Sequence, residues 1–341
     1  MAVLTEKENY KLVLEGKTPG WVPRFGLGND PYAKNPSGSK GIMSSIYPRT
    51  RNEDGSSVDM FGIKHVPTVE TGGMSLPEPG NFILDDVRNW RDVIKVPDLS
   101  EVNWELQCKR DLETTGDLSN FVVSLGTHVG YFQHLMNFMG FSNGLVAMFE
   151  EPDEVLALYE FLSDFYTTVL ENQLKYFTMV DVLGITDDTA TATNPFISPQ
   201  MYRDMVKPYH ARLGKYGQDR GMHVMMHNCG RCEDSIDDWR DFGVDSWNPA
   251  QVVNDLAGIK QKYGNSLVLI GCWDSQGPAG WPDASEEVVR QAVRDCIDTY
   301  GANGGYMFWG SVYGPVGDVG TENKKRWMTE EFEAYRDNPY K

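Results

Sequence analysis

The chain has 341 residues, of which 31 are Lys or Arg and 49 are Asp or Glu, so its formal net charge at pH 7 is −18. This balance argues against nucleic-acid binding, which depends on clustered Lys and Arg. Hydrophobic residues make up 40% and charged residues 23%, values typical of a folded globular protein rather than of an acidic disordered chain.

The first residues contain Glu6, Lys7 and Glu8 and no apolar segment of the kind that directs secretion. The longest stretch without Asp, Glu, Lys or Arg, Leu118–Phe149, is interrupted by histidines and amides, which is not typical of a membrane span. We therefore expect a cytoplasmic protein without a membrane segment. Five cysteines, an odd number, argue against a disulfide framework.

Residues 1–115 are rich in proline and turn sequences and predict an irregular N-terminal cap. From about Asn120, short apolar runs alternate with long amphipathic segments, the pattern of βα units and a parallel sheet. The predicted strands are Phe121–Leu125, Val180–Thr186, His223–His227, Val244–Trp247, Leu267–Gly271 and Tyr306–Trp309. The predicted helices are Pro152–Met179, Pro199–Tyr216, Cys232–Phe242, Val252–Tyr263 and Ser285–Tyr300.

This alternation predicts an α/β fold with a single (β/α)8 TIM-type barrel over residues 116–341, packed against the cap as one structural domain. A doubly wound open sheet is the alternative. The piece Gly26–Asp30 is not a GxGxxG sequence, so a dinucleotide-binding fold gains little support.

Polar residues follow several predicted strands, at the end where a barrel gathers its functional groups. His227 and Cys229 are two residues apart and point the same way from an extended strand end, and Cys232 follows in the next turn. Cys272 ends a further strand. Imidazole and thiolate are ligands that zinc prefers, so the cluster favours a metal site over cysteines that are only buried packing residues.

Asp187 and Asp188 end another strand, where one carboxylate can bind or protonate a substrate while the other caps a turn. Cys108 and Cys296 are interpreted as packing residues, and His128, His134 and His210 as ordinary core or surface histidines. The Met- and Phe-rich run from His134 to Phe149 favours core, with an apolar wall for a flat ligand as the alternative.

Motifs along most of the chain resemble those of the uroporphyrinogen decarboxylase superfamily. The segments that carry the resemblance are Asn9–Lys17 with Trp21–Pro23, Gly140–Leu145 through Pro152, Thr186–Asp188, Ile197–Tyr202, Lys207–His210, His227–Gly230, Gly243–Asp245 and Gly304–Tyr306. The arginine-rich N-terminal signature of the true decarboxylases is missing near Arg24. The His-x-Cys pair instead looks like the zinc site of the corrinoid-dependent methyltransferases of this superfamily.

The resemblance implies a second set of zinc ligands. Asp204, Cys232 and Cys272, with 27 and 39 residues between them, resemble the pattern of methyltransferase I of vanillate-type aryl ether O-demethylases. Strand geometry favours His227, Cys229 and Cys272, so two sets compete and share Cys272.

The implied activity is zinc-dependent cleavage of a phenyl methyl ether, a vanillate-like methoxyarene, with transfer of the methyl group to cob(I)alamin on a partner corrinoid protein. Asp187 or Asp188 would donate a proton or orient the phenol, and Tyr202, Trp247 and Trp309 would stack on the ring. The alternatives are a metal-free decarboxylase using Arg24, Arg49 or Arg51, a methyltransferase acting on a thiol such as coenzyme M, and a non-catalytic corrinoid-binding module. The oligomeric state stays open, a homodimer being compatible with the sequence.

Overall fold

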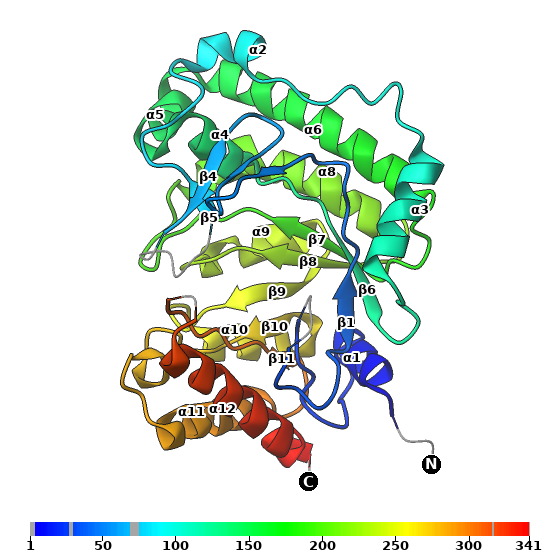
Figure 1. Ribbon diagram of the computed structural model, residues 1–341, viewed down its shortest axis with the longest axis vertical. Helices are drawn as coiled ribbons and strands as arrows, with labels where there is room; N and C mark the ends of the chain where they lie inside the picture. Colours follow the sequence, from blue (N-terminus) through cyan, green and yellow to red (C-terminus); the bar gives the residue numbers. More distant parts are fainter. Residues whose placement is uncertain (1–3, 27–29, 69–74, 316, 341) are drawn as a thin grey trace.

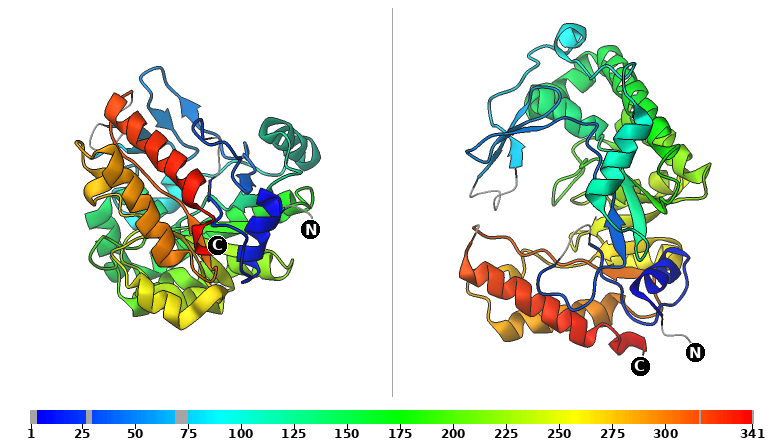
Figure 2. Two further views of the ribbon diagram at one scale, coloured as in Figure 1. Left: turned by 90° about the horizontal axis from the view of Figure 1, so that it is seen from below. Right: turned by 45° about the vertical axis from the view of Figure 1, so that its right-hand side comes forward.

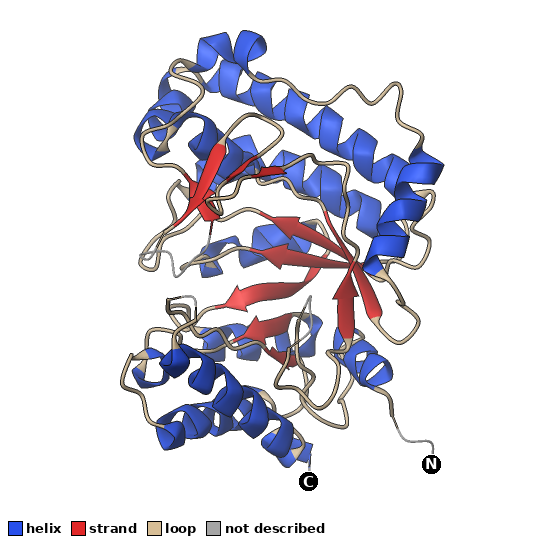
Figure 3. Ribbon diagram, in the orientation of Figure 1, coloured by secondary structure: helices blue, strands red, loops and turns tan. Residues whose placement is uncertain are grey.

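The computed structural model describes residues 4–26, 30–68, 75–315 and 317–340, and a curled parallel sheet lies at its centre (Figure 1 and Figure 3). The seven strands pair in chain order, each parallel to the next. They are β1 (Ser39–Gly41), β6 (Val122–Gly126), β7 (Val182–Thr186), β8 (His223–His227), β9 (Val244–Ala250), β10 (Val268–Gly271) and β11 (Tyr306–Phe308).

The N-terminal segment bridges the two edges of this sheet. Arg24 forms a parallel bridge with Phe308 of β11, so an eighth extended segment extends the sheet on that side. On the other side, the hydroxyls of Ser37 and Ser39, next to and within β1, each donate to the Gly26 carbonyl at 3.2 Å. The predicted α/β class with a TIM-type barrel is therefore confirmed.

Helices cover the outside of the sheet (Figure 1 and Figure 2). They are α1 (Glu6–Leu14), α2 (Trp90–Val93), α3 (Trp104–Thr115), α4 (Tyr131–Met139), α5 (Phe141–Glu150), α6 (Pro152–Leu174), α7 (Pro199–Met201), α8 (Lys207–Gln218), α9 (Ile236–Asp241), α10 (Leu256–Tyr263), α11 (Glu286–Tyr300) and α12 (Val319–Tyr335). A π-helical turn, Tyr202–Val206, joins α7 to α8, so the predicted helix Pro199–Tyr216 is one interrupted segment. No helix in the described ranges has the length and apolar character needed to cross a bilayer.

A small antiparallel sheet stands beside α4, at the opposite end of the molecule from α11 and α12 (Figure 1 and Figure 2). Its strands are β2 (Thr50–Arg51), β3 (Ser57–Val58), β4 (Lys64–Pro67) and β5 (Ser75–Pro77). The division into residues 1–115 and 116–341 stays a prediction, but β1 and the Arg24 bridge show that the N-terminal part supplies strands to the main sheet.

Side chains alternate between the two faces of each strand and so decide where a site can form. Val122, Val182 and Val268 point into the barrel, where they pack with Tyr10 and Val13 of α1 in a small apolar cluster. The intervening residues pack outward against the helices in the main core. Apolar side chains and α1 thus close the barrel at the amino ends of its strands. The barrel is open at the carboxyl ends of the strands.

Candidate metal site and substrate cavity

A cavity of about 560 Å³ occupies the upper part of the barrel, a size that suits a small-molecule ligand. The inward positions that follow the apolar layer along β6 and β7 carry small residues, among them Ser124, Gly126 and Gly184, which leave the space open. The full lining is Phe25, Gly26, Ser124, Leu125, Gly126, His128, Val129, Gly130, Gln133, His134, Asn137, Gly184, Thr186, Met225, His227, Asn248 and Trp309.

Three metal-ligating side chains meet at the rim of this cavity. Asp188 follows β7, His227 ends β8, and Cys229 lies two residues beyond it. One ligand atom from each lies within 4.8 Å of the other two. All three side chains are half-buried, and His227 is the member of the cluster that lines the cavity. Among the described residues, it is the one group of at least three His, Cys, Asp or Glu side chains that lie close enough together to hold a metal ion.

The hydrogen bond made by one ring nitrogen of His227 fixes the role of the other. Nδ1 of His227 lies 2.7 Å from Oδ1 of Asn248, its register partner on β9. An amide oxygen can only accept, so Nδ1 carries the proton and the lone pair is on Nε2. Nε2 lies 3.7 Å from both Sγ of Cys229 and Oδ1 of Asp188. The imidazole is therefore held in the tautomer that binds a metal from this side.

Asp188 is held in place by two donors. The backbone N–H of Cys229 donates to Oδ1 at 2.8 Å, and the side-chain amide of Gln133 donates to Oδ2 at 3.0 Å. Burial, reinforced by the charge of Asp188, raises the pKa of the Cys229 thiol to about 12. A divalent cation bound here would supply the positive charge that favours the thiolate.

A sharp turn at Gly230 directs the chain away after Cys229. Gly230 has φ +88°, and a Cβ at this position would lie 2.5 Å from the backbone oxygen of Thr191. Only glycine meets both conditions. Asn254 holds the next residues by accepting from the N–H groups of Cys232 and Glu233 at 3.0 and 3.1 Å. The loop that carries Cys229 is thus fixed on both sides.

Asp187, the neighbour of Asp188, points into the protein and is fully buried. Its carboxylate accepts from the N–H groups of Phe132 and Gln133, both at 3.0 Å, in the first turn of α4. His210 contributes a third contact through Nε2 at 3.1 Å. Because Gly130 at the start of α4 has no side chain, Asp187 serves as the N-cap of that helix from another element. The structure therefore places Asp187 outside the cavity, in a positioning role.

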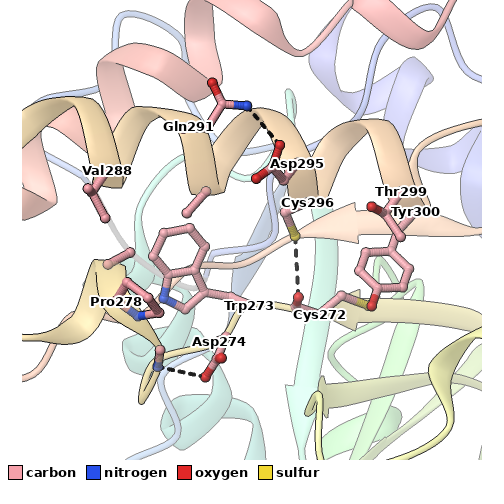
Figure 4. A pocket seen from close by; sticks show the side chains of 13 residues that line it. Cys272, Trp273, Asp274, Pro278, Val288, Gln291, Asp295, Cys296, Thr299 and Tyr300 are labelled. Atoms are coloured by element: carbon pink, nitrogen blue, oxygen red, sulfur yellow. Dashed lines mark hydrogen bonds between the residues drawn. The ribbon is translucent and has the colours of Figure 1, made fainter.

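The other predicted metal ligands lie apart from this cluster. Cys272 has φ +56° and lines a separate pocket of about 420 Å³ between the end of β10 and α11, together with Cys296 and Tyr300 (Figure 4). Cys232 is buried, with its sulfur 3.6 Å from the backbone oxygens of Asn228 and Gly230. Asp204 is exposed and bonded to Gln200. Neither predicted set of three ligands forms a group; of their members, His227 and Cys229 come together.

Of the three aromatic residues predicted to stack on a ring, Trp309 lines the cavity, with its ring edge-on to Phe25 at 5.5 Å. Tyr202 and Trp247 are buried in the core instead. The hydroxyl of Tyr202 bonds to His210, and the indole N–H of Trp247 donates to the Asn228 carbonyl. Aromatic residues with a polar atom are stable in a core when that atom finds a partner, as both do here.

Most of the cavity lining was not predicted from the sequence as site residues, including the polar residues Gln133, His134, Asn137 and Asn248. His128 and His134, both interpreted from the sequence as ordinary histidines, line the cavity, and His128 has φ +59°. A non-glycine residue with positive φ directly after a strand is uncommon and often marks a site. The Met- and Phe-rich run forms α4 and α5, and its large side chains belong mainly to the core.

The arginines considered for carboxylate binding do not reach this cavity. Arg24 pairs with Asp30 and donates to the Asn35 carbonyl, in a neighbouring pocket. Arg49 and Arg51 are exposed near and in β2.

A parallel barrel with its cavity and polar cluster at the carboxyl ends of the strands defines the class of the protein as a TIM-type α/β barrel with a small-molecule site. The family model of uroporphyrinogen decarboxylase (URO-D) matches residues 69–312, and the chain belongs to this family. The fold is similar to the solved structure of a methyltransferase from Methanosarcina mazei, with a TM-score of 0.60 and 12% identity over 98% of this chain and 100% of that chain. No curated protein matches the chain significantly.

Proposed function

We propose that the chain is a zinc-dependent methyltransferase that cleaves a phenyl methyl ether and passes the methyl group to cob(I)alamin carried by a partner corrinoid protein. The observation that carries this proposal is the cluster of Asp188, His227 and Cys229 at the rim of the barrel cavity. The resemblance of the His-x-Cys pair to corrinoid-linked methyltransferases and the fold shared with a methyltransferase support it.

The donor set fits zinc. Nitrogen, sulfur and carboxylate oxygen are its usual protein ligands, and three of them leave one position for a substrate, as in catalytic zinc sites. Asn248 provides the hydrogen bond that orients a ligating histidine in such sites. When bound, zinc would act as a Lewis acid that stabilises negative charge on the ether or neighbouring phenol oxygen.

The remaining groups bind and orient the substrate. Trp309 and Phe25 offer apolar surface to an aromatic ring, and Asn137 and His134 offer hydrogen bonds to its polar substituents. The carbon–oxygen bond of the ether breaks, the methyl group passes to the acceptor, and the oxygen keeps the electron pair and then takes up a proton. Asp187 holds α4 and thereby the position of Gln133, which bonds Asp188.

The decarboxylase alternative is less well supported. Decarboxylation of a tetrapyrrole with several acid groups requires arginines for those groups, whereas Arg24 is paired with Asp30 and no Lys or Arg lines the cavity within the described residues.

Metal content is the first test. We expect about one zinc per chain in anaerobically purified wild type and its loss in His227→Ala and in Cys229→Ala. Cys272→Ala and Cys296→Ala are the matched cysteine controls outside the cluster, and both should keep the metal. Loss of zinc in Cys272→Ala, with Cys229→Ala unaffected, would reject this ligand set.

Activity is the second test. Wild type, supplied with methoxyarenes and cob(I)alamin, should release the phenol and methylate the cobalt, while His227→Ala should be at least 100-fold slower. A wild type that releases carbon dioxide from acid substrates and leaves methoxyarenes unchanged would refute the proposal.

A further inference from the structure

Among the described residues, His128 is the histidine whose ring has no polar partner. The chain has six histidines, and each of the other five has a ring nitrogen within 3.1 Å of a polar side-chain atom of another residue. The pairs are His65–Asp59, His134–Tyr166, His210–Asp187, His223–Asp245 and His227–Asn248. Desolvation lowers the pKa of His128, which agrees with a ring surrounded by protein but without a carboxylate beside it.

The ring of His128 adjoins the barrel cavity. His128 lies two residues after β6 and lines the cavity with an accessible side chain. Gly126 makes room for the ring, since a Cβ added to Gly126 would lie 3.7 Å from Nε2 of His128 and a larger side chain would occupy the same space. The ring of Tyr47 packs against the imidazole with the centroids 5.1 Å apart. The ring is therefore held beside the cavity without the use of its nitrogens.

The backbone of His128 is strained, and its ring makes no hydrogen bond within the described structure that would offset the strain. Its φ of +59° lies in the left-handed region, which costs free energy for every residue except glycine. Residues held in such conformations cluster at ligand sites, where the strain serves to position a side chain. A strained residue whose polar atoms face a cavity, and not a structural partner, indicates that a ligand is the partner.

An imidazole can bind a hydroxyl in either protonation form. The neutral ring has one donor and one acceptor nitrogen, the protonated ring has two donors, and a phenolic oxygen both donates and accepts. A methyl group in the same place does neither, so it would leave the enclosed ring nitrogen without a partner, which weakens binding.

We propose that His128 hydrogen-bonds a ring hydroxyl of the substrate and thereby selects methoxyphenols over methoxyarenes that lack this hydroxyl. The inference rests on the proposed function, within which it assigns a specificity-determining residue. Asn137, which lines the cavity from α4, is the competing candidate for this contact, but its backbone is helical and unstrained.

Two probes of nearly equal shape test this contact. 2-Methoxyphenol and 2-methoxytoluene differ in a hydroxyl or a methyl group on the same ring carbon. Calorimetry on the purified protein gives the ratio of the two affinities, independently of turnover. We expect this ratio to fall at least about five-fold from wild type to His128→Phe, because the substitution keeps a ring and removes its nitrogens. An unchanged ratio, or a wild type that binds neither probe, would overturn the inference.

Three variants show whether the effect belongs to the ring nitrogens. His128→Gln keeps a hydrogen-bonding group and should restore most of the ratio. His128→Gly adopts positive φ without strain and should lower the ratio as His128→Phe does, which covers the case that the phenylalanine variant does not fold. Asn137→Leu should keep the wild-type ratio. A fall in the ratio in Asn137→Leu, with His128→Phe and His128→Gly unchanged, would assign the contact to Asn137 and reject the inference.

Metal content and thermal melting exclude other roles of His128. The folded variants should hold as much zinc as the wild type, because His128 lies outside the cluster of Asp188, His227 and Cys229. Loss of zinc in a folded His128→Phe protein would make His128 a metal ligand and overturn the inference. Equal weakening of both probes would assign it a role in the shape of the cavity and would also overturn it.

Turnover separates this inference from the proposed function. If the ratio depends on His128 and 2-methoxyphenol is not demethylated, the methyltransferase proposal fails while hydroxyl recognition by His128 stands. If 2-methoxyphenol is demethylated and the ratio does not depend on His128, the methyltransferase proposal holds and the inference about His128 is wrong.

Discussion

Asp187 and Asp188 are consecutive residues whose carboxylates face opposite sides of the end of β7. Asp187 is fully buried and accepts from the first turn of α4, whereas Asp188 is half-buried and joins His227 and Cys229 at the cavity rim. The alternation of side chains along an extended segment explains this difference. One carboxylate thus positions a helix that lines the cavity, and its neighbour offers a ligand atom.

Asp187→Asn should destabilise the protein by about 1–3 kcal/mol, because its side chain keeps one oxygen and can no longer accept from the N–H groups of both Phe132 and Gln133. The free energy of unfolding in urea measures the effect. Asp188→Asn is the control with the same chemical change, and it should alter stability by less than about 1 kcal/mol in metal-free protein while lowering zinc affinity. Equal destabilisation by both substitutions would contradict the division of roles.

Asn248→Ala should weaken zinc binding about 10- to 100-fold although every ligand remains, since the hydrogen bond that keeps the lone pair on Nε2 of His227 is lost. Competition with a chromophoric chelator measures the affinity. Asn143→Ala, on the exposed surface of α5, should bind zinc as the wild type does. Unchanged affinity in Asn248→Ala would show that His227 needs no partner to bind the metal.

Gly230→Ala should both destabilise the fold and remove the metal, because a Cβ would meet the backbone oxygens of Ala190 and Thr191 at 2.6 and 2.5 Å. Gly221 also has positive φ but has nothing within 4 Å of such a Cβ. We expect a loss of about 1 kcal/mol for Gly221→Ala, with zinc content unchanged, and a larger loss for Gly230→Ala. Similar losses, with zinc kept in both, would show that the loop tolerates the contact.

Protonation of His223, at the start of β8 and the closed end of the barrel, should make the stability of the protein depend on pH. Its hydrogen bond to Asp245 raises the pKa of His223 in the folded state. The protonated form therefore favours folding, so the stabilisation is complete below the unfolded-state pKa of about 6.5 and disappears as the pH rises through the folded-state value. His223→Gln should lower Tm more at about pH 5.5 than at about pH 9.

Thermal melts of wild type, His223→Gln, Asp245→Asn and the double variant, all in chelator, would measure this contribution. The two substitutions should be non-additive at about pH 5.5, because each removes the same ion pair. A decrease in Tm that is equal at both pH values would reject an electrostatic origin.

The strands that form the site could be predicted from the sequence because they combine apolar runs with polar ends. His223–His227 is predicted and observed with the same bounds, and the spacing of His227 and Cys229 correctly brings both to one place. By contrast, β1 has the sequence Ser-Lys-Gly, with no apolar signal, so the contribution of the N-terminal part to the sheet is not visible before pairing is known.

The rest of the site depends on backbone directions and on contacts between strands. Cys272 follows a strand as expected, but its positive φ turns the chain so that the side chain lies against α11 in a different pocket. Asn248 acts on His227 only because the register of β8 and β9 places them opposite each other. Asp188 was predicted to act in catalysis, and its closeness to the His-x-Cys pair follows from the pairing of β7 with β8.

The bridge between Arg24 and Phe308 also bears on how the protein is made. These residues lie far apart in the chain, so their pairing carries a large loop-closure cost and is expected late in folding. During synthesis, most of the chain has emerged from the ribosome before Phe308 can pair with the segment around Arg24. Phe25 and Trp309, each next to a bridge residue, therefore complete the cavity wall only at the end of folding, and a nascent chain has no finished binding site to occupy.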